Sequence, residues 1–177
     1  MMKLALTDTL EARAGYGQKP RSGITLDGRL RVWRADGTLM VDEGNVVVTA
    51  GLEALVDALV AAAYVNTFKY IGFGTDTDET DAGDTTLGTE LSGGTYARLT
   101  GTQGEGDNTS EYRVSGVWTN NSSSNPAVVT EYGLFSASTV GTLLARVSTQ
   151  DDSPPASKSV ATGETITVQW DFQLADA

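Results

Sequence analysis

The sequence predicts a mainly β protein, with an antiparallel β-sandwich or jelly-roll-like body, one α-helix and an extended N-terminal arm. Three observations support this fold class. Short segments rich in β-branched and aromatic residues recur between turn-rich loops. A helical period occurs once, at about residues 50–63, so the alternating helices of a parallel sheet are missing. Residues 1–28 show no sustained period and contain Gly15, Gly17, Pro20, Gly23 and Gly28.

The chain has 177 residues, enough for one packed domain with an arm. We divide it into an attachment arm at 1–28 and a body at 29–177. Hydrophobic residues make up 40% and charged residues 20%, as in folded soluble proteins. The start has no signal-peptide pattern, and acids interrupt the longest apolar stretch, 52–65. These features predict a soluble protein made in the cytoplasm, without a membrane partner.

Charge is distributed unevenly along the chain. Residues 1–34 carry seven basic and three acidic residues, whereas the rest carries five basic and twenty acidic residues. This asymmetry favours an arm that docks on an acidic surface over chance clustering in a surface strand. The basic residues assigned to this attachment role are Lys3, Arg13, Lys19, Arg21 and Arg29.

The first half of the body predicts a hairpin, a strand start and the helix. Residues 29–34 alternate polar and apolar side chains, 35–38 supply a turn, and 39–41 return. Residues 45–48 start another strand.

The helix at 50–63 has Thr49 as its expected N-cap. Its apolar stripe has ordinary width, which favours packing against a sheet over binding a partner helix. The stripe consists of Leu52, Leu55, Val56, Leu59 and Val60.

The second half of the body predicts strands only. Each segment is short, rich in β-branched or aromatic residues and bounded by turn residues. The predicted strands are 68–73, 96–99, 111–118, 127–135, 142–147 and 165–174.

The composition excludes several classes of enzyme. The chain has no cysteine and no histidine, which excludes disulfides, thiolate nucleophiles, histidine bases and Cys/His zinc sites. It also lacks a Gly-x-Ser-x-Gly elbow and a phosphate-binding loop followed by Lys-Ser/Thr. No carboxylate pair is marked out for glycoside hydrolysis. We therefore expect no enzymatic activity and no cofactor, and the acidic body argues against nucleic acid as a partner.

An acidic loop contains the only metal candidates in the sequence. Five acids occupy positions 76–84, including Asp76, Asp78, Asp81 and Asp84. An EF-hand requires Asp or Asn at its fifth position and glycine at its sixth, where this loop has Thr80 and Asp81. We therefore predict a solvated loop and no metal site, with calcium or magnesium in another geometry as the alternative.

Glu131 interrupts a strand-like apolar stretch at 128–135. A buried carboxylate requires a partner, since an unpaired one costs several kcal/mol and protonates instead. Arg98 and Arg146 are the isolated basic residues on neighbouring predicted strands. We predict that Glu131 forms a structural ion pair with such an arginine.

An ordered string of short motifs resembles the phage tail-collar fibre family over roughly residues 45–147. In order, the motifs are Val48-Thr49-Ala50-Gly51-Leu52, Ile71-Gly72-Phe73-Gly74-Thr75, Thr86-Leu87-Gly88-Thr89-Glu90-Leu91, Arg98, Thr130-Glu131-Tyr132-Gly133-Leu134-Phe135 and Gly141-Thr142-Leu143-Leu144-Ala145-Arg146. The resemblance implies a structural virion protein that places tail fibres on a baseplate and has no catalytic role.

This resemblance leads to several expectations about partners. The chain ends soon after its last predicted strand, without a fibre shaft or receptor-binding tip, so we expect an adaptor or attachment component. Its partners would be other virion proteins and further copies of itself, with a trimer expected from the habit of fibres. It would be made in the host cytoplasm and reside in the virion. A capsid decoration or turret protein is the first alternative.

The second alternative is a carbohydrate-binding module that recognises a glycan of the host surface. Exposed aromatic rings stack on sugars in such modules, and calcium could lie in the 76–84 loop. The candidate rings are Trp33, Trp118, Tyr96 and Tyr112.

Overall fold

The structure is a computed structural model, which describes residues 24–61, 68–122, 127–149 and 158–176. The described elements are β1 (Ile24–Arg34), β2 (Leu39–Gly44), β3 (Val46–Val47), α2 (Thr49–Ala61), β4 (Tyr70–Gly74), the 3-10 helix η1 (Gly94–Tyr96), β5 (Leu99–Thr100), β6 (Thr102–Glu105), β7 (Glu111–Thr119), β8 (Ala127–Val129), β9 (Glu131–Phe135), β10 (Leu143–Ser148), β11 (Lys158–Val160) and β12 (Thr165–Asp176).

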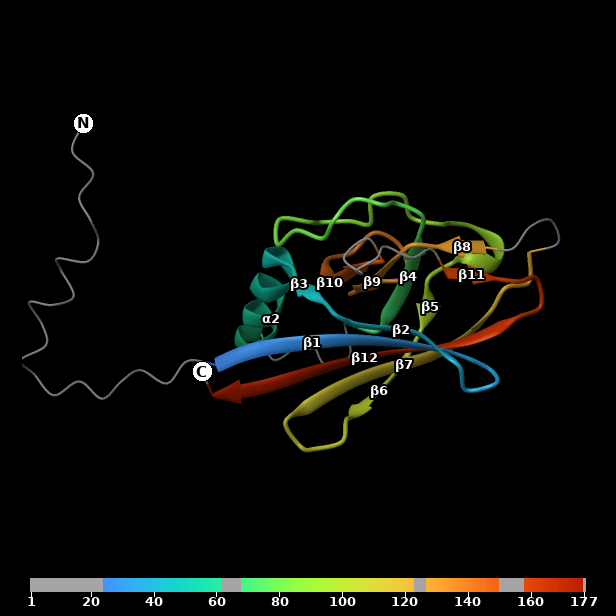
Figure 1. Cartoon of the computed structure of the whole chain (residues 1–177). Helices are drawn as coiled ribbons and strands as arrows, with labels where there is room; N and C mark the ends of the chain where they lie inside the picture. Colours follow the sequence, from blue (N-terminus) through green and yellow to red (C-terminus); the bar gives the residue numbers. More distant parts are fainter. Residues whose placement is uncertain (1–23, 62–67, 123–126, 150–157, 177) are drawn as a thin grey trace, which may run out of the picture.

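These strands form two antiparallel five-stranded sheets and one small sheet (Figure 1). Sheet A has the order β2-β1-β12-β7-β6, and sheet B has the order β3-β10-β9-β4-β5. The small sheet pairs β11 with β8. The mainly β, antiparallel sandwich that the sequence predicts is thus confirmed, with one α-helix among the described residues.

The main core lies between sheets A and B. Alternating residues of the long strand β12, among them Val168, Trp170 and Phe172, are buried there. Phe73 and Tyr132 of sheet B meet them, and Phe73 stacks on Trp118 with ring centroids 4.8 Å apart. The alternation of apolar residues along β12 therefore arises because one face of this strand packs in the core.

Sheet B is buried on both faces, which distinguishes it from sheet A. Every residue of β9 and β10 is buried. The loop that connects β4 to η1 passes over the outer face of sheet B (Figure 1), where Leu87 packs with Phe135 and Leu143 in a second apolar cluster. Because both faces are covered, these two strands are mostly apolar and do not alternate, although Glu131 and Arg146 interrupt them.

The helix α2 packs against the end of sheet B through its first turn. Gly51 is buried, and a Cβ atom there would lie 2.6 Å from the Cα of Leu144, so only glycine permits this approach. Leu52 is 43% exposed, whereas Ala54 and Leu55 pack against the main core. Leu52 therefore does not belong to the buried stripe predicted for it. None of the described helices is long and apolar enough to cross a membrane.

Several predicted boundaries differ from the structure. β1 begins at Ile24, so residues 24–28 belong to a strand and not to the arm predicted there. Thr49 is the first residue of α2 and not its N-cap. Only the end of predicted strand 96–99 is extended, because η1 occupies its start. Predicted strand 127–135 is two strands in different sheets, and the sequence did not reveal β6 or β11.

Candidate functional site

Two polar clusters lie on the outer faces of the sandwich, one on each sheet. The first is centred on Glu131 of β9, which is fully buried. Glu131 does not point into the core between the sheets but lies beneath the loop that covers sheet B. The backbone N–H groups of Thr89 and Gly88 donate hydrogen bonds to its carboxylate, at 2.8 and 3.0 Å. The N–H of Asp76 donates a third, at 3.3 Å. The carboxylate thus fastens both ends of the loop to sheet B.

Arg146 of β10 is the charged partner of Glu131. Its Nη2 lies 2.9 Å from Glu131 Oε2, and its Nε donates to the same oxygen at 3.0 Å. Its side chain is only 3% exposed. Burial lowers the pKa of Arg146, but hydrogen bonds and charge from Asp84 and Glu131 outweigh burial and raise it. The guanidinium therefore stays charged in its buried position.

The acidic loop folds around this arginine and is not simply solvated. Arg146 donates to Asp84 Oδ2 at 2.8 Å, and Asp76 Oδ2 lies 3.5 Å from its Nη2. The same guanidinium donates to the backbone carbonyl of Asp78 at 3.4 Å. Asp81 instead stabilises the turn by accepting the N–H of Gly83 at 2.7 Å. Among the described residues, no group of three or more acidic side chains is arranged to hold a metal ion.

Glycines leave the space that this cluster occupies. A Cβ atom on Gly74 would lie 2.2 Å from Glu131 Oε1, and one on Gly88 would lie 1.6 Å from Asp76 Oδ2. Both distances are far below van der Waals contact. Glycine is therefore required at both positions, because any larger residue would occupy the space of the Glu131 carboxylate beside Gly74 or of the Asp76 carboxylate beside Gly88.

Arg98 is not a partner of Glu131, although the sequence proposed it as one. It forms a two-bond ion pair with Glu90, with Nε–Oε1 at 2.6 Å and Nη2–Oε2 at 2.9 Å. Its guanidinium carbon lies 3.4 Å from the centre of the Phe135 ring. It also donates to the carbonyls of Ala137 and Val140. Arg98 therefore joins the covering loop to the turn between β9 and β10.

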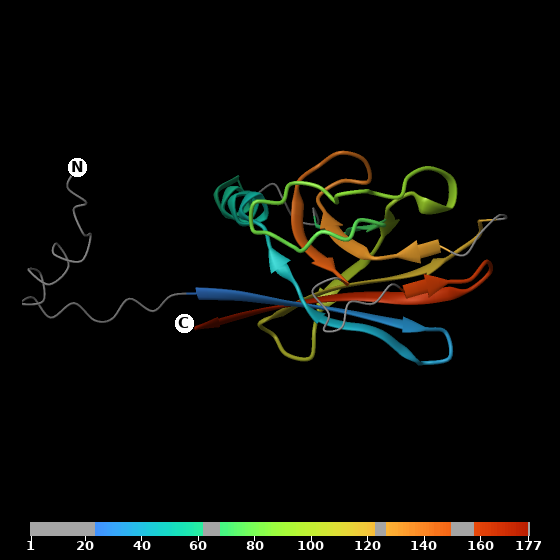
Figure 2. The same cartoon turned by 45° about the horizontal axis from the view of Figure 1, so that its top comes forward.

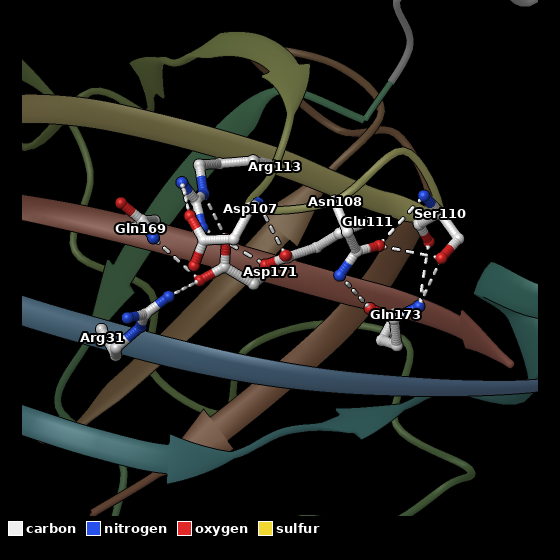
Figure 3. Close-up of polar contacts among 9 residues, drawn as sticks. All are labelled: Arg31, Asp107, Asn108, Ser110, Glu111, Arg113, Gln169, Asp171 and Gln173. Atoms are coloured by element: carbon white, nitrogen blue, oxygen red, sulfur yellow. Dashed lines mark hydrogen bonds and ion pairs between the residues drawn. The ribbon is translucent and has the colours of Figure 1, made fainter.

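The second cluster lies on the outer face of sheet A and is centred on Asp171 of β12 (Figure 3). Its carboxylate binds Arg31 of β1 and Arg113 of β7, the latter at 2.5 Å. The amide of Gln169 donates a further hydrogen bond at 2.8 Å. Asp171 therefore connects the three central strands of the sheet, although its side chain is on the outer face and only 8% exposed.

Opposite charges determine the protonation states in this cluster. Burial raises the pKa of Asp171, but the hydrogen bonds from Gln169, Arg113 and Arg31 outweigh burial and lower it. The pKa of Arg113 is raised, first by its bond to Asp171 and then by its bond to Asp107. A carboxylate held ionised by guanidinium groups is a poor general acid. The arrangement thus suits structural cross-links and not proton transfer.

The Asp171 cluster continues toward the hairpin between β6 and β7. Gln173 binds Asn108 and Ser110 there, at 3.0 and 2.8 Å, as Figure 3 shows. An open groove of about 340 Å³ lies beside it, lined by residues that include Arg31, Glu111 and Asp171. The groove is open and lined mostly by charged residues, which suits contact with a protein surface better than enclosure of a small molecule.

The aromatic residues proposed for glycan binding are mostly occupied in packing. Trp118 is 5% exposed and donates its indole N–H to the carbonyl of Thr95. Tyr96 packs against Trp118, and the hydroxyl of Tyr112 donates to the carbonyl of Phe68 at 2.7 Å. The guanidinium carbon of Arg31 lies over the ring of Trp33, 5.5 Å from its centre, in a cation–π contact. No described pair of these rings forms an exposed platform for sugars.

The predicted attachment residues are only partly described. Lys3, Arg13, Lys19 and Arg21 lie outside the described residues. Arg29 lies on β1 and pairs with Asp42 of β2 at 2.5 Å, so it is part of sheet A and not of an arm.

The Asp171 cluster was not predicted from the sequence. The available signal was the period of two in β12, since Gln169, Asp171 and Gln173 alternate with its buried residues and therefore share the outer face. Their partners Arg31 and Arg113 lie on strands that only the sheet order brings together. The chain matches no protein-family model, and no curated protein or solved structure is significantly similar to it.

Proposed function

We propose that this chain is a structural protein of a tailed-virus particle, an attachment or adaptor component of the tail fibre or baseplate that acts by protein-protein docking. One observation carries the proposal: most of the motifs that resemble the tail-collar fibre family, although spread along the sequence, come together around two ion pairs. Gly74 and Gly88 accommodate the Glu131–Arg146 cluster, and Glu90 pairs with Arg98. Motifs that contact one another in space support a common structural origin better than scattered matches do.

The chemistry of these clusters also favours a structural role. Each central carboxylate, Glu131 or Asp171, is bound by guanidinium groups from neighbouring strands. Such pairs fix strand register and loop position. The outer face of sheet A adds the polar Asp171 cluster beside an open groove, and partly polar surfaces are typical of non-obligate interfaces.

The point where residues 1–23 join the body is compatible with a docking role. The first residue of β1, Ile24, lies opposite Asp176 near the end of β12. Figures 1 and 2 both place the start of β1 and the end of β12 side by side at one end of the sandwich. A basic arm attached there leaves the opposite end of the body available to another virion protein.

A truncation tests the proposal directly. Deleting residues 1–22 removes Lys3, Arg13, Lys19 and Arg21 but keeps β1 intact. We expect the truncated protein to stay folded and to be lost from purified particles, as measured by quantitative mass spectrometry. A charge-reversed arm in the full-length chain serves as the matched variant. Normal incorporation of both variants would refute the attachment role.

The location of the protein separates the proposal from its first alternative. A tag fused to the C-terminus and imaged on particles by electron microscopy should appear at the fibre attachment region. Regular labelling of the head would instead identify a capsid decoration or turret protein.

A further inference from the structure

Among the strands that the structure describes, the first four residues of β1 have a neighbour on one side only. β1 pairs with β12 along its whole length, from Ile24 opposite Asp176 to Arg34 opposite Ile166. β2 pairs only with the segment from Arg29 to Trp33. Within the described part of the chain, nothing pairs with the other edge of Ile24–Asp27. Figure 2 shows this end of β1, beside the end of β12, extending past the rest of the body.

The backbone groups of Leu26 point to this open edge. The carbonyl of Gly28 accepts the N–H of Asn45, just after β2, at 2.9 Å, so Gly28 points away from β12. The backbone N–H and C=O groups of successive residues point to opposite edges of a strand. Those of Leu26 therefore point to the same edge as those of Gly28. Its cross-strand neighbour Leu174 donates its N–H to Ser110 on the opposite side, at 3.0 Å, which agrees with this assignment. Leu26 thus offers one donor and one acceptor to an additional strand.

The same segment has an incompletely covered apolar side. Leu26 is only partly buried, and Leu174 opposite it is 47% exposed. Natural sheet edges are usually protected by lysine, proline or a bulge. Segment 24–27 contains neither lysine nor proline, and its only charge is Asp27. By contrast, the edge strand β2 contains both Asp42 and Glu43.

We propose that this edge pairs with the same edge of a second copy of the chain, antiparallel and about a two-fold axis at Leu26. In this register Leu26 faces Leu26 of the other copy, and the two residues exchange two backbone hydrogen bonds. In the same register, Thr25 lies opposite Asp27 of the other copy. A register centred on Asp27 would instead oppose two carboxylates, which is unfavourable.

The contact is small, and this determines how strongly it should associate. A stable interface buries about 800 Å² on each partner, far more than four edge residues supply. The free chain should therefore form a dimer only at high concentration. A two-fold contact gives a dimer and not the trimer expected from the resemblance. The inference does not depend on the virion role.

Engineered cysteines test the register, because the chain has no cysteine of its own. Thr25→Cys and Asp27→Cys proteins are mixed in equal amounts and oxidised mildly. Opposed residues of this type have Cα atoms about 4.5 Å apart, within disulfide range. The mixture should form at least about tenfold more disulfide-linked dimer than either protein alone, since opposed Cα atoms are in range only in the mixture. Leu39→Cys, on the exposed edge strand β2, measures random collision.

A matched pair of variants tests the hydrogen bonds. Leu26→Pro removes the N–H at the open edge without removing a bond to β12, whereas Leu26→Ala trims the side chain and keeps the N–H. Both proteins are combined with the cysteine pair, and circular dichroism checks their folding. Proline should reduce the dimer yield about tenfold relative to alanine, the factor expected from losing two hydrogen bonds.

Three results would overturn the proposal. The first is an equal disulfide yield from the mixture and from the single cysteine proteins. The second is a monomer at every concentration in sedimentation equilibrium. The third is cross-linking of Asp27→Cys to a second cysteine placed before residue 24 of the same chain, which would show that the protein covers its own edge.

Discussion

Glu131 and Arg146 lie on the adjacent strands β9 and β10 and form an ion pair in which both side chains are buried, at 0% and 3% exposure. Three backbone N–H groups of the covering loop also donate to Glu131. The pair therefore does more than balance charge, since it fixes the loop on sheet B. Its removal should affect both the free energy of unfolding and the order of the loop.

The first prediction concerns this pair. Glu131→Gln places an amide donor either against the N–H groups of Thr89 and Asp76 or against Gly88 and Arg146. It also removes the charge of Glu131 from Arg146 and leaves Asp84 as its nearest ionic partner. We expect the free energy of unfolding to fall by about 3 to 5 kcal/mol. Urea denaturation followed by tryptophan fluorescence measures the loss. Asp42→Asn, which breaks a more exposed pair with Arg29, should cost less than about 1 kcal/mol. Equal losses would contradict the assigned role of Glu131.

The second prediction tests the space beside Glu131. Gly74→Ala places a methyl group 2.2 Å from Glu131 Oε1, so the buried carboxylate must move away from its hydrogen-bond donors. We expect a loss of about 2 to 4 kcal/mol from broken hydrogen bonds and strain. Gly104→Ala is the matched control, because its added methyl group would meet no atom within 4 Å. This control in β6 should leave stability unchanged or slightly raised, since alanine reduces the entropy of the unfolded chain. Thermal unfolding of both variants decides the matter.

The third prediction concerns pH. The pKa of Asp171 is lower in the folded protein than its ordinary value of about 3.9. Its ionised form therefore stabilises the fold fully above about pH 4, and this stabilisation is lost as the pH falls through the folded pKa. Asp171→Asn should cost about 1 to 3 kcal/mol at pH 7, since Arg31 and Arg113 lose their shared charge. The difference from wild type should shrink between about pH 4 and pH 2. A difference that is constant over this range would exclude Asp171 as the titrating group.

The predictable part of the fold was the part encoded in local periods. The alternation in β12 and around Leu30 and Val32 of β1 identified strands with one buried face. The predicted strand boundaries were wrong where contacts between distant segments determine where a strand begins or ends. Thr130 is the single residue between β8 and β9, and no turn residue marks a boundary there, yet these two strands belong to different sheets. The start of β1 at Ile24 depends on its partner β12, which lies at the other end of the chain.

The candidate site was predictable only in part, for a similar reason. The sequence marked Glu131 because a charge in an apolar run requires a partner, and the structure brings Arg146 to it. It could not choose between Arg98 and Arg146, since that choice depends on strand order: β9 has β10 on one side and β4 on the other. Glu90, the actual partner of Arg98, lies in a loop. A loop has no regular alternation of apolar residues, so the sequence does not predict which residues it contacts. Asp171 was overlooked because an acid at an outer strand position looks solvated until the neighbouring strands are known.

The fourth prediction tests Arg98 as a cross-link between loops. Arg98→Lys keeps the charge but removes the two-bond geometry with Glu90, the stacking on Phe135 and the bonds to the carbonyls of the β9–β10 turn. We expect the free energy of unfolding to fall by about 2 kcal/mol, because several partly buried interactions of the guanidinium are removed together. Amide hydrogen exchange should quicken in the turn, most clearly at Ser136, whose N–H donates to Thr142 at 2.9 Å. Arg29→Lys is the control, because its side chain is 57% exposed and its pair with Asp42 should tolerate the change within about 0.5 kcal/mol. If both lysine variants behave alike, Arg98 contributes charge alone and the turn is held by its own backbone.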